Sequence, residues 1–536
     1  MLLIWLLTIL FVFITICVGV WGMKRSRTLG DFFIGGRTLG PWVSAFAYGT
    51  SYYSAVMFIG FAGQLGWGFG LNVLWISFGN TFLGCLLAWF VLGYRTRRMT
   101  QRLGVMTMPE FFDRRLNAPM LKIFAAVIIF LFLLPYSAAA FTGLAYLFKV
   151  TLGIDFAYAL IGMCVVTAIY LILGGYMAIS LNDFIQGTVM LVGSILMFLI
   201  LTHKVGGFSE AISTIQTNYP AHLGGKLPPW YIIAGATFMT SFGVWGLPQM
   251  VQKFYAIKDE KQILRAAIVT TVFSFVVVFA GYFNGSMMHI FYTNPAVVTT
   301  SEEAAAYEEA LQKTGTLKDE NGKIVPTPAP YVTNEDGSQK KKSDKPIIAY
   351  DELVPRLLQT QLPPALMAVI VVLVLSATMS TLSSLILVAS SAIAIDLYKE
   401  HADLDESSQK PLYLIRFLNG LFILISALLA LFKFSFIVAM MSLSWGCVAG
   451  AFMAPYLYSL YWKRLNKYGA VAGMVTGLTL NIVLFLCGVN STLAASLAIL
   501  VPFIVIPVVT LCTPKPDKEL VDSAFYDKLE SGVETV

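Results

Sequence analysis

The stretch "SATMSTLSSL" (residues 376–385) places a dense set of hydroxyl side chains within an otherwise apolar part of the chain. It is preceded by "ALMAVIVVLVL" (365–375) and followed by "ILVASSAIAI" (386–395), both of which suit the interior of a lipid bilayer. Four of the hydroxyls share one face of the predicted helix, at positions i, i+1, i+3 and i+4: Ser380, Thr381, Ser383 and Ser384. Such a face either packs against a neighbouring membrane helix or supplies oxygen ligands to a cation.

The composition of the chain indicates a membrane protein. Of the 536 residues, 57% are hydrophobic and 12% are charged, whereas a soluble domain has about 25% charged residues. Apolar runs of about twenty residues recur along the length, which predicts an all-α protein that crosses the lipid bilayer many times. Basic loops explain the net charge of +6, so we expect no nucleic-acid partner. The six cysteines lack the spacing of metal ligands and are predicted to be free thiols.

About thirteen apolar segments are long enough to form transmembrane helices. The first is predicted to be a retained helix, because its positive charges follow the apolar run and no small-residue cleavage site is present. The predicted spans cover residues 2–22, 41–68, 71–93, 121–148, 155–174, 184–203, 229–252, 266–292, 364–395, 412–432, 435–461, 469–487 and 492–512.

An odd number of spans places the two termini on opposite sides of the membrane. Basic residues gather in the short loops on one side, and the positive-inside rule makes that side cytoplasmic. The N-terminus is therefore predicted to be outside and the C-terminus cytoplasmic. The loop residues that decide this orientation are Lys24, Arg25, Arg27, Arg37, Arg95, Arg97, Arg98, Arg102, Arg114, Arg115, Lys253, Lys258, Lys261, Arg265, Lys399, Lys410, Lys463, Arg464 and Lys467.

Two of the predicted spans carry residues in their middles that favour a break in the helix. In the second and seventh spans these residues are Gly49, Thr50 and Ser51, and Gly243, Gly246 and Pro248, respectively. Each set alone is compatible with a plain kink. The two breaks lie five spans apart, however, and an odd offset reverses the direction of the chain through the membrane. Spans 2–6 and 7–11 are therefore predicted to form a five-plus-five inverted repeat with a binding site at the breaks.

The predicted spans and loops divide the chain into consecutive parts. The predicted parts are a leading helix with the first cytoplasmic loop (1–36), the first five-helix repeat (37–203), an external loop (204–228), the second five-helix repeat (229–461) with an external insertion (294–348), two additional helices (462–512) and a cytoplasmic tail (513–536).

Asp183 is a charged residue at the beginning of the sixth predicted span. It either caps that helix at the cytoplasmic face, where the helix dipole favours a carboxylate, or belongs to a functional site in the membrane. If it reaches the hydroxyl face of the ninth span, it supplies the negative charge of a cation site.

Four motifs resemble those of the sodium:solute symporter family. They are "GGRTLGPW" (35–42), "MPEFF" (108–112), "LNDFIQG" (181–187) and "MSTLSSLILVASSAIAIDLY" (379–398). The resemblance covers all thirteen spans and implies a five-plus-five inverted repeat with an extra leading helix. It also implies Na⁺ as the coupling ion, held between the break in the second span and the start of the ninth. The matching ligands are the carbonyls of Thr50, Tyr53 and Ala377 and the hydroxyls of Ser380 and Thr381.

Some members of that family hold a second sodium ion nearer the cytoplasm. The matching positions in this chain are Asp183, Ser380, Ser383 and Ser384. The solute is expected against the same helix breaks, at positions that match Tyr52, Ser54, Met57, Asn72, Trp75, Tyr136, Trp245, Gln249 and Trp445. The pattern looks closest to the pantothenate, monocarboxylate and proline-type branch, although Tyr52 stands where proline transporters carry an acidic residue. No Arg or Lys is expected to be buried near the site, so a carboxylate solute would rely on helix N-termini, backbone amides or the sodium ion.

The sequence therefore predicts sodium-coupled symport of a small organic solute, a carboxylate or an amino acid, by alternating access across a cell membrane, with the bacterial inner membrane as the expected location. An enzyme is not expected, because the four histidines are scattered and no HExxH, GxSxG or phosphate-binding loop is present. The alternatives are a membrane sensor with a separate signalling partner, a symporter for a neutral polar solute and, third, a channel. No obligate protein partner is evident.

Overall fold

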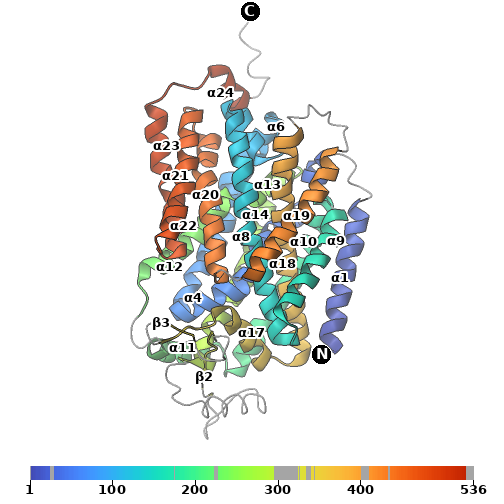
Figure 1. The fold of residues 1–536 in the computed structure, drawn as a ribbon, viewed down its shortest axis with the longest axis vertical. Helices are drawn as coiled ribbons and strands as arrows, with labels where there is room; N and C mark the ends of the chain where they lie inside the picture. Colours follow the sequence, from blue (N-terminus) through green and yellow to red (C-terminus); the bar gives the residue numbers. More distant parts are fainter. Residues whose placement is uncertain are drawn as a thin grey trace, which may run out of the picture.

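The computed structural model describes residues 2–23, 29–173, 175–222, 227–294, 324, 326–332, 340–342, 345–399, 410–432 and 435–526. These residues form a bundle of long helices with two very short strand pairs at one end (Figure 1). Most of the predicted external insertion (294–348) and the last ten residues of the predicted tail lie outside the described residues.

The first part of the chain is helical almost throughout. Its elements are α1 (Leu2–Met23), α2 (Leu29–Ile34), η1 (Gly35–Arg37), α3 (Pro41–Tyr52), η2 (Val56–Phe61), α4 (Ala62–Phe69), η3 (Gly70–Val73), α5 (Leu74–Phe78), η4 (Gly79–Leu87), η5 (Trp89–Gly93), α6 (Tyr94–Arg102), α7 (Met108–Leu116), α8 (Pro119–Leu152), α9 (Phe156–Leu173), α10 (Tyr176–Lys204) and α11 (Phe208–His222).

The second part adds the short strands and the remaining helices. Its elements are α12 (Trp230–Phe242), η6 (Gly243–Gly246), α13 (Pro248–Ala256), α14 (Lys261–Ser286), α15 (Met288–Phe291), β1 (Tyr292–Thr293), β2 (Thr327–Pro328), β3 (Lys341–Lys342), β4 (Lys345–Pro346), α17 (Tyr350–Gln361), α18 (Pro364–Ile393), η8 (Ala394–Lys399), α19 (Lys410–Phe432), α20 (Ile437–Tyr461), α21 (Lys467–Leu486), α22 (Ser491–Leu500), α23 (Pro502–Leu511) and α24 (Lys518–Phe525). Strand β1 pairs with β2 in parallel, and β3 pairs with β4 antiparallel.

Within the described residues, ten helical segments are long and apolar enough to cross a membrane, and a bent pair formed by α12 with η6 and α13 makes an eleventh. One of the ten, Val56–Arg102, contains both the end of the second and all of the third predicted span. Gly70 divides that segment, because its φ of +52° and ψ of −133° lie outside helical geometry and favour glycine. The count of thirteen spans stays a prediction.

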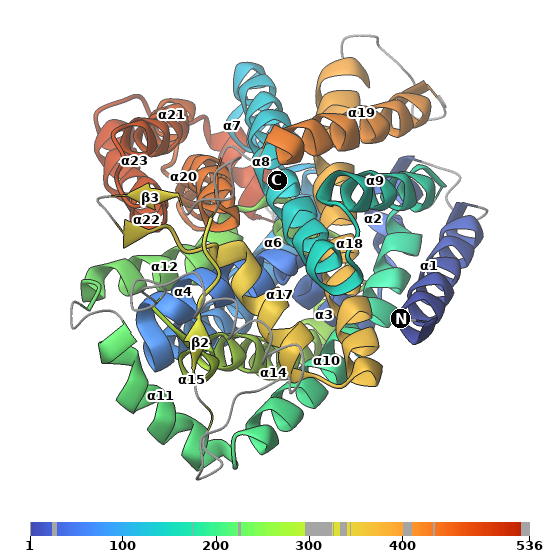
Figure 2. The same ribbon diagram turned by 60° about the horizontal axis from the view of Figure 1, so that its bottom comes forward.

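The ninth predicted span, α18, is deeply buried within the bundle. In its most apolar stretch 89% of the residues are buried, a value shared with α20, whereas none of the other eight continuous spans exceeds 61%. Helices α3, α8, α10 and α19 pack around α18 (Figure 2). Burial from all sides explains why apolar residues surround its hydroxyls without the alternation of an amphipathic helix.

The second predicted span is broken, but later than the glycine position indicated. Gly49, Thr50 and Ser51 all lie in the last helical turns of α3, and the helix ends at Tyr53, whose backbone is extended (φ −109°, ψ 111°). Gly49 serves packing instead, because a Cβ atom there would lie 2.4 Å from the ring of Phe273 on α14.

The seventh predicted span breaks at the expected residues. Helix α12 tightens into the 3₁₀ turn η6, Leu247 is extended, and α13 begins at Pro248 with a bend of 48°. A proline is well placed at the first position of a helix, since its missing N–H would have no partner there. Gly246 permits the close approach of α20, because a Cβ atom would lie 2.7 Å from the backbone nitrogen of Met453.

The first and the last described helices, α1 and α24, reach opposite ends of the bundle (Figure 1). Helix α1 begins at the end that also carries α11, α17 and the short strands, and α24 lies at the other end, near α6. We refer to these as the α17 end and the α6 end. The arrangement agrees with an odd number of crossings, while the side that faces the cytoplasm stays a prediction.

Candidate functional site

The hydroxyl face of α18 lies against the end of α3. Ser380 Oγ donates a hydrogen bond to the carbonyl oxygen of Thr50 at 3.0 Å, and Thr381 Oγ1 donates to the same carbonyl at 3.3 Å. The carbonyls in the last turn of a helix lack helical partners, so these oxygens are free to accept bonds from another element. The break in the second span and the hydroxyls of the ninth therefore meet, as the sequence predicts.

Further oxygens converge on the same point. Ser380 Oγ also lies 3.1 Å from the carbonyl oxygen of Ala377, and Thr381 Oγ1 lies 3.4 Å from that of Ser51. All these residues are fully or almost fully buried. Four of the five predicted sodium ligands, Thr50, Ala377, Ser380 and Thr381, are thus in mutual contact. The fifth, Tyr53, is the residue at which α3 ends, and its hydroxyl contacts Ser274 on α14.

The second predicted set of sodium ligands is already in contact with the ammonium group of a lysine. Ser384 Oγ lies 2.8 Å from Ser51 Oγ and accepts a hydrogen bond from Lys253 Nζ at 3.0 Å. The same ammonium lies 3.4 Å from Asp183 Oδ2. Ser383 Oγ is bonded to the carbonyl of Ser380 in its own helix at 2.8 Å.

Two expectations about basic residues are therefore wrong. Lys253 was assigned to a cytoplasmic loop, yet it lies in α13 with 1% of its surface exposed. The expectation that no Arg or Lys is buried near the site fails for the same reason. Helix α13 continues to Ala256, four residues past the predicted end of the span, and this extension carries Lys253 inward to Asp183 on α10.

A narrow cavity lies beside the helix break and has a volume of about 10 Å³, roughly enough for one water molecule. The lining includes four of the predicted solute-binding residues: Tyr52, Ser54, Met57 and Trp445. Tyr136, also predicted, packs edge-on against Trp445 with ring centroids 5.8 Å apart. Four of the nine predicted solute-binding residues thus line this cavity, and a fifth, Tyr136, packs beside it.

Four other predicted solute-binding residues are absent from this lining. Asn72 and Trp75 line a wider cleft of about 740 Å³ at the α17 end, together with Tyr219 and Trp230. Trp245 donates its indole N–H to the carbonyl of Leu83 at 3.1 Å. Gln249 is buried one helical turn before Lys253, on the same face of α13.

Comparison with known sequences identifies the family of this chain. The profile of the sodium:solute symporter family matches residues 32–310 and 344–477. The chain belongs to the sodium:solute symporter family. It is 27% identical over 465 residues to an osmoregulated proline transporter of Bacillus subtilis, which covers 86% of this chain and 84% of that protein. It is 28% identical over 480 residues to a sodium/proline symporter of Staphylococcus aureus, which covers 88% of this chain and 83% of that protein.

A solved structure of a Na⁺-coupled sialic acid symporter, in a substrate-bound outward-open state, has the same fold as this chain. The TM-score is 0.75 at 16% identity, and the match covers 96% of this chain and 98% of that one. The expected family is thereby confirmed, and the proline-type branch agrees with the relatives found. This family member is a multi-pass protein of the cell membrane and a transporter, not an enzyme, with Na⁺ as its coupling ion.

Several residues that line the cavity of this symporter were not predicted from the sequence. Asn80, Thr240, Tyr282 and Met441 all contribute to it. Asn80 accepts a hydrogen bond from Ser241 Oγ at 3.2 Å. Asn80 could have been predicted, because it is a polar amide within the apolar run "ISFGNTFLG" (76–84), two helical turns after Asn72.

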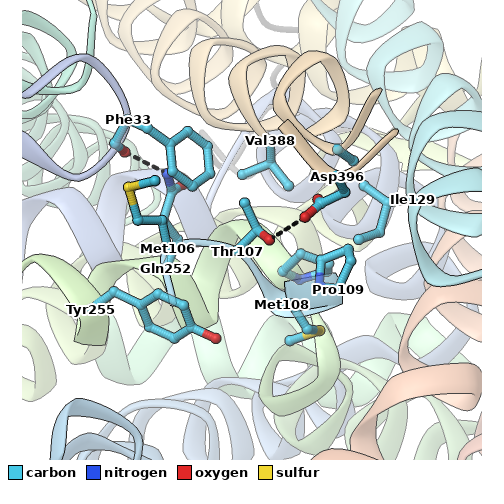
Figure 3. A pocket seen from close by; sticks show the side chains of 12 residues that line it. Phe33, Met106, Thr107, Met108, Pro109, Ile129, Gln252, Tyr255, Val388 and Asp396 are labelled. Carbon is cyan, nitrogen blue, oxygen red and sulfur yellow. Dashed lines mark hydrogen bonds between the residues drawn. The ribbon is translucent and has the colours of Figure 1, made fainter. Parts of the chain in front are cut away.

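At the α6 end of this symporter, residues of separate sequence motifs are in contact. Thr107, which caps α7 in the "MPEFF" region, donates a hydrogen bond of 2.6 Å to Asp396 in the "DLY" that follows α18 (Figure 3). Gln252 donates to the carbonyl of Phe33 at 2.8 Å on the other side of the same narrow pocket, which has a volume of about 10 Å³ (Figure 3).

Arg37, in the "GGRTLG" motif, ties three further segments at this end. Its guanidinium donates hydrogen bonds to the carbonyl of Tyr255 in α13 at 3.0 Å and to the carbonyl of Val105 at 2.8 Å, and it contacts Thr100 in α6 at 3.3 Å. Burial lowers the pKa of Arg37 below its ordinary value, but an arginine stays charged at neutral pH.

At the opposite end, α17 covers the helices that flank the cavity. Gly63 of α4 would bring a Cβ atom within 2.5 Å of the carbonyl oxygen of Tyr350, so the two helices are in close contact. Asp351 Oδ2 accepts a hydrogen bond from the backbone N–H of Ile437 at 3.3 Å, at the first residue of α20. Burial raises the pKa of Asp351 to about 7.

Proposed function

We propose that this chain carries a small amino acid or carboxylate across the membrane together with Na⁺ by alternating access. The observation that supports this most is the contact between the hydroxyls of Ser380 and Thr381 and the carbonyl of Thr50 at the break in α3. Neutral oxygens from two different helices are then available to a monovalent cation, next to a narrow cavity.

The proposed sodium ion is held by the carbonyls of Thr50, Tyr53 and Ala377 and the hydroxyls of Ser380 and Thr381. Each hydroxyl now donates to a backbone carbonyl, and a bound cation would turn the hydroxyl oxygens toward itself, because a hydroxyl keeps lone pairs for a ligand. Sodium would thus replace hydrogen bonds between α3 and α18 by stronger ionic contacts to both helices. This couples ion occupancy to the geometry of the break.

The proposed solute site is the cavity formed by Tyr52, Ser54, Met57, Tyr136 and Trp445, with the addition of Asn80 and Thr240. Its lining contains aromatic, amide and hydroxyl groups and no charged side chain. A solute that is neutral overall, such as a zwitterionic amino acid, suits this lining: its carboxylate would face the sodium ion, and its ammonium would face aromatic rings. The cavity has room for about one water molecule in this structure, so a solute would require it to widen, and a small solute requires the least widening.

Proline is the first solute to test, because the relatives reported above are proline transporters. Tyr52 in place of an acidic residue separates this chain from that pattern, so other small amino acids belong in the same screen. A neutral polar solute is the second candidate, and the uncharged lining is the observation that favours it. Asn72 and Trp75 are proposed to act only on the entry path, while Trp245 and Gln249 support the broken helix.

For the architecture, we propose thirteen spans with the N-terminus outside and the C-terminus cytoplasmic. Residues 37–203 and 229–461 would form the two inverted five-helix repeats, preceded by 1–36 and followed by the two helices of 462–512. The α6 end is then cytoplasmic, where Arg37 and the Thr107–Asp396 contact hold the inner side closed. Residues 204–228 and 294–348 would be external, and 513–536 would be the cytoplasmic tail.

Uptake of radiolabelled proline into proteoliposomes, with and without an inward sodium gradient, tests the proposal. The Ser380→Ala, Thr381→Ala double variant should need at least about tenfold more Na⁺ for half-maximal uptake, since two of five ligands are lost. The matched control is Thr378→Ala with Ser391→Ala, because these hydroxyls on the same helix bond to carbonyls of that helix. An unchanged sodium dependence in the Ser380 and Thr381 variant would remove both residues from the site. A screen of other amino acids and small carboxylates identifies the solute if proline is not carried.

A further inference from the structure

A buried ion pair connects three elements that lie far apart in the sequence. Asp183 is on α10, Lys253 is on α13, and Ser384 is on α18. Lys253 Nζ lies 3.4 Å from Asp183 Oδ2 and 3.0 Å from Ser384 Oγ. The exposed fractions of Asp183 and Lys253 are 0% and 1%, so water does not screen the pair. A buried lysine at this depth requires partners, and both partners here are ones predicted to bind a sodium ion.

The ammonium of Lys253 is fully provided with acceptors. It has three N–H donors, and it meets three acceptors: the carboxylate of Asp183, the hydroxyl of Ser384 and the ring face of Tyr176, whose centroid is 5.2 Å away. The arrangement is that of an occupied cation site, in which the cation belongs to a side chain.

This occupied site is joined to the proposed sodium ligands by a short chain of polar contacts. Ser384 Oγ, which accepts from Lys253, lies 2.8 Å from Ser51 Oγ at the end of α3. The carbonyl of Ser51 in turn lies 3.4 Å from Thr381 Oγ1. One hydroxyl therefore separates the Lys253 ammonium from the break in α3, and the two cation positions are neighbours.

The charges decide how many ions this region can hold. The contacts described contain one carboxylate, from Asp183, and one ammonium, from Lys253. A sodium ion placed between Asp183 and Ser384 would share both ligands with the ammonium, and it would lie within a few ångströms of a like charge in an environment that screens poorly. The carboxylate cannot compensate two cations.

We propose that Lys253 is a built-in cation that takes the place of a second sodium ion, so that this chain binds and transports one Na⁺ per cycle. This inference rests on the proposed sodium symport and refines its stoichiometry. Because the ammonium is attached to α13, it neutralises Asp183 without crossing the membrane. Only the sodium ion at Ser380 and Thr381 then adds to the net charge moved with a neutral solute.

The proposal further implies that Lys253 determines the number of ions bound. Without the ammonium, Asp183, Ser384 and the nearby hydroxyls would be a vacant set of hard oxygen ligands that lacks a cation. Substitution of Lys253 by a neutral residue of similar length should therefore create a second sodium site. Substitution by arginine should leave a single site, since the guanidinium keeps the positive charge.

The experiment is equilibrium binding of radioactive sodium to the purified full-length protein, at constant ionic strength with choline as the replacing cation. This measurement needs no solute. We expect about one Na⁺ bound per molecule in the natural protein and in Lys253→Arg, and about two in Lys253→Met. The double variant Lys253→Met, Asp183→Asn should return to one. Lys122→Met, which removes another buried lysine on α8, should also keep one.

Two results would overturn the proposal. The first is two bound sodium ions in the natural protein, which needs no variant and so remains decisive if Lys253→Met does not fold. The second is a single bound ion in a folded Lys253→Met protein. Failure of the sodium symport itself is distinguishable, because it would show as no saturable sodium binding in the natural protein and no effect of Ser380→Ala.

Discussion

The hydroxyl of Tyr52 donates a hydrogen bond of 2.5 Å to the backbone carbonyl of Thr240. Tyr52 is the last residue of α3, and Thr240 lies in the last turn of α12, so the bond joins the two broken helices directly beside the cavity. The ring of Tyr52 also stacks on Tyr53 at 4.3 Å. The bond therefore connects the two broken helices through a residue that lines the proposed solute site.

The variant Tyr52→Phe tests this link. It keeps the ring and its stacking, but it leaves the buried Thr240 carbonyl without its partner, which costs about 1–3 kcal/mol. We expect solute affinity to fall by about fivefold or more, while sodium binding in the absence of solute stays unchanged. The control is Tyr48→Phe, which removes a buried hydrogen bond of 2.8 Å to the carbonyl of Gly84 outside the cavity lining. An equal loss of solute affinity in both variants would assign the effect to general stability.

The Asp183–Lys253 pair should contribute strongly to the stability of the bundle. Removal of one member of a buried pair leaves an uncompensated charge, which typically costs about 3–5 kcal/mol. Asp183→Asn in sodium-free buffer should therefore lower the thermal unfolding temperature strongly. The double variant Asp183→Asn, Lys253→Met should recover part of this loss, because no charge remains. Additive losses in the double variant would contradict a direct interaction.

Gly246→Ala should damage the broken helix of the second repeat. A Cβ atom at this position would lie between 2.7 and 2.9 Å from the backbone and Cβ of Met453, and backbone cannot move aside cheaply. We expect a destabilisation of about 1–3 kcal/mol together with loss of transport. Gly68→Ala is the matched control, because nothing lies within 4 Å of a Cβ atom there and alanine favours the helix. Thermal unfolding of both variants in detergent measures the difference.

Asp351 should make the contact between α17 and α20 dependent on pH. Burial raises its pKa to about 7, whereas an aspartate in the unfolded chain has a pKa near 3.9. The native state therefore binds more protons than the unfolded state between about pH 4 and pH 7. Stability should fall as the pH rises through this window, by at most about 1.4 kcal/mol per pH unit, and become flat above it.

The measurement for Asp351 is the thermal unfolding temperature as a function of pH. Asp351→Asn keeps the shape of the side chain but cannot ionise, so its profile should lack the decline between pH 4 and 7 that the natural protein shows. Identical slopes for the natural protein and this variant would assign the pH dependence to other groups. Because α17 covers the helices beside the cavity, we expect the same variant to alter the pH dependence of uptake.

The sequence by itself determined the membrane character, most of the spans, the hydroxyl face of α18 and the existence of two broken helices. These features depend on local properties: runs of apolar residues predict spans, a 3.6-residue period places Ser380 and Thr381 on one face, and a proline stops a helix where it stands. The family motifs added the pairing of Thr50 with Ser380 and Thr381, which the structure places in contact.

The tertiary structure alone decided which residues meet. Local sequence predicted the break at Gly49, but the helix continues to Tyr52, and Gly49 instead permits the close approach of Phe273. The sequence pattern predicted a loop position for Lys253, since a lysine directly after an apolar run normally reaches the membrane surface. It is buried instead because Asp183, seventy positions earlier in the chain, supplies the opposite charge. The energy of a buried charge depends on partners from distant elements, and no local pattern contains that information.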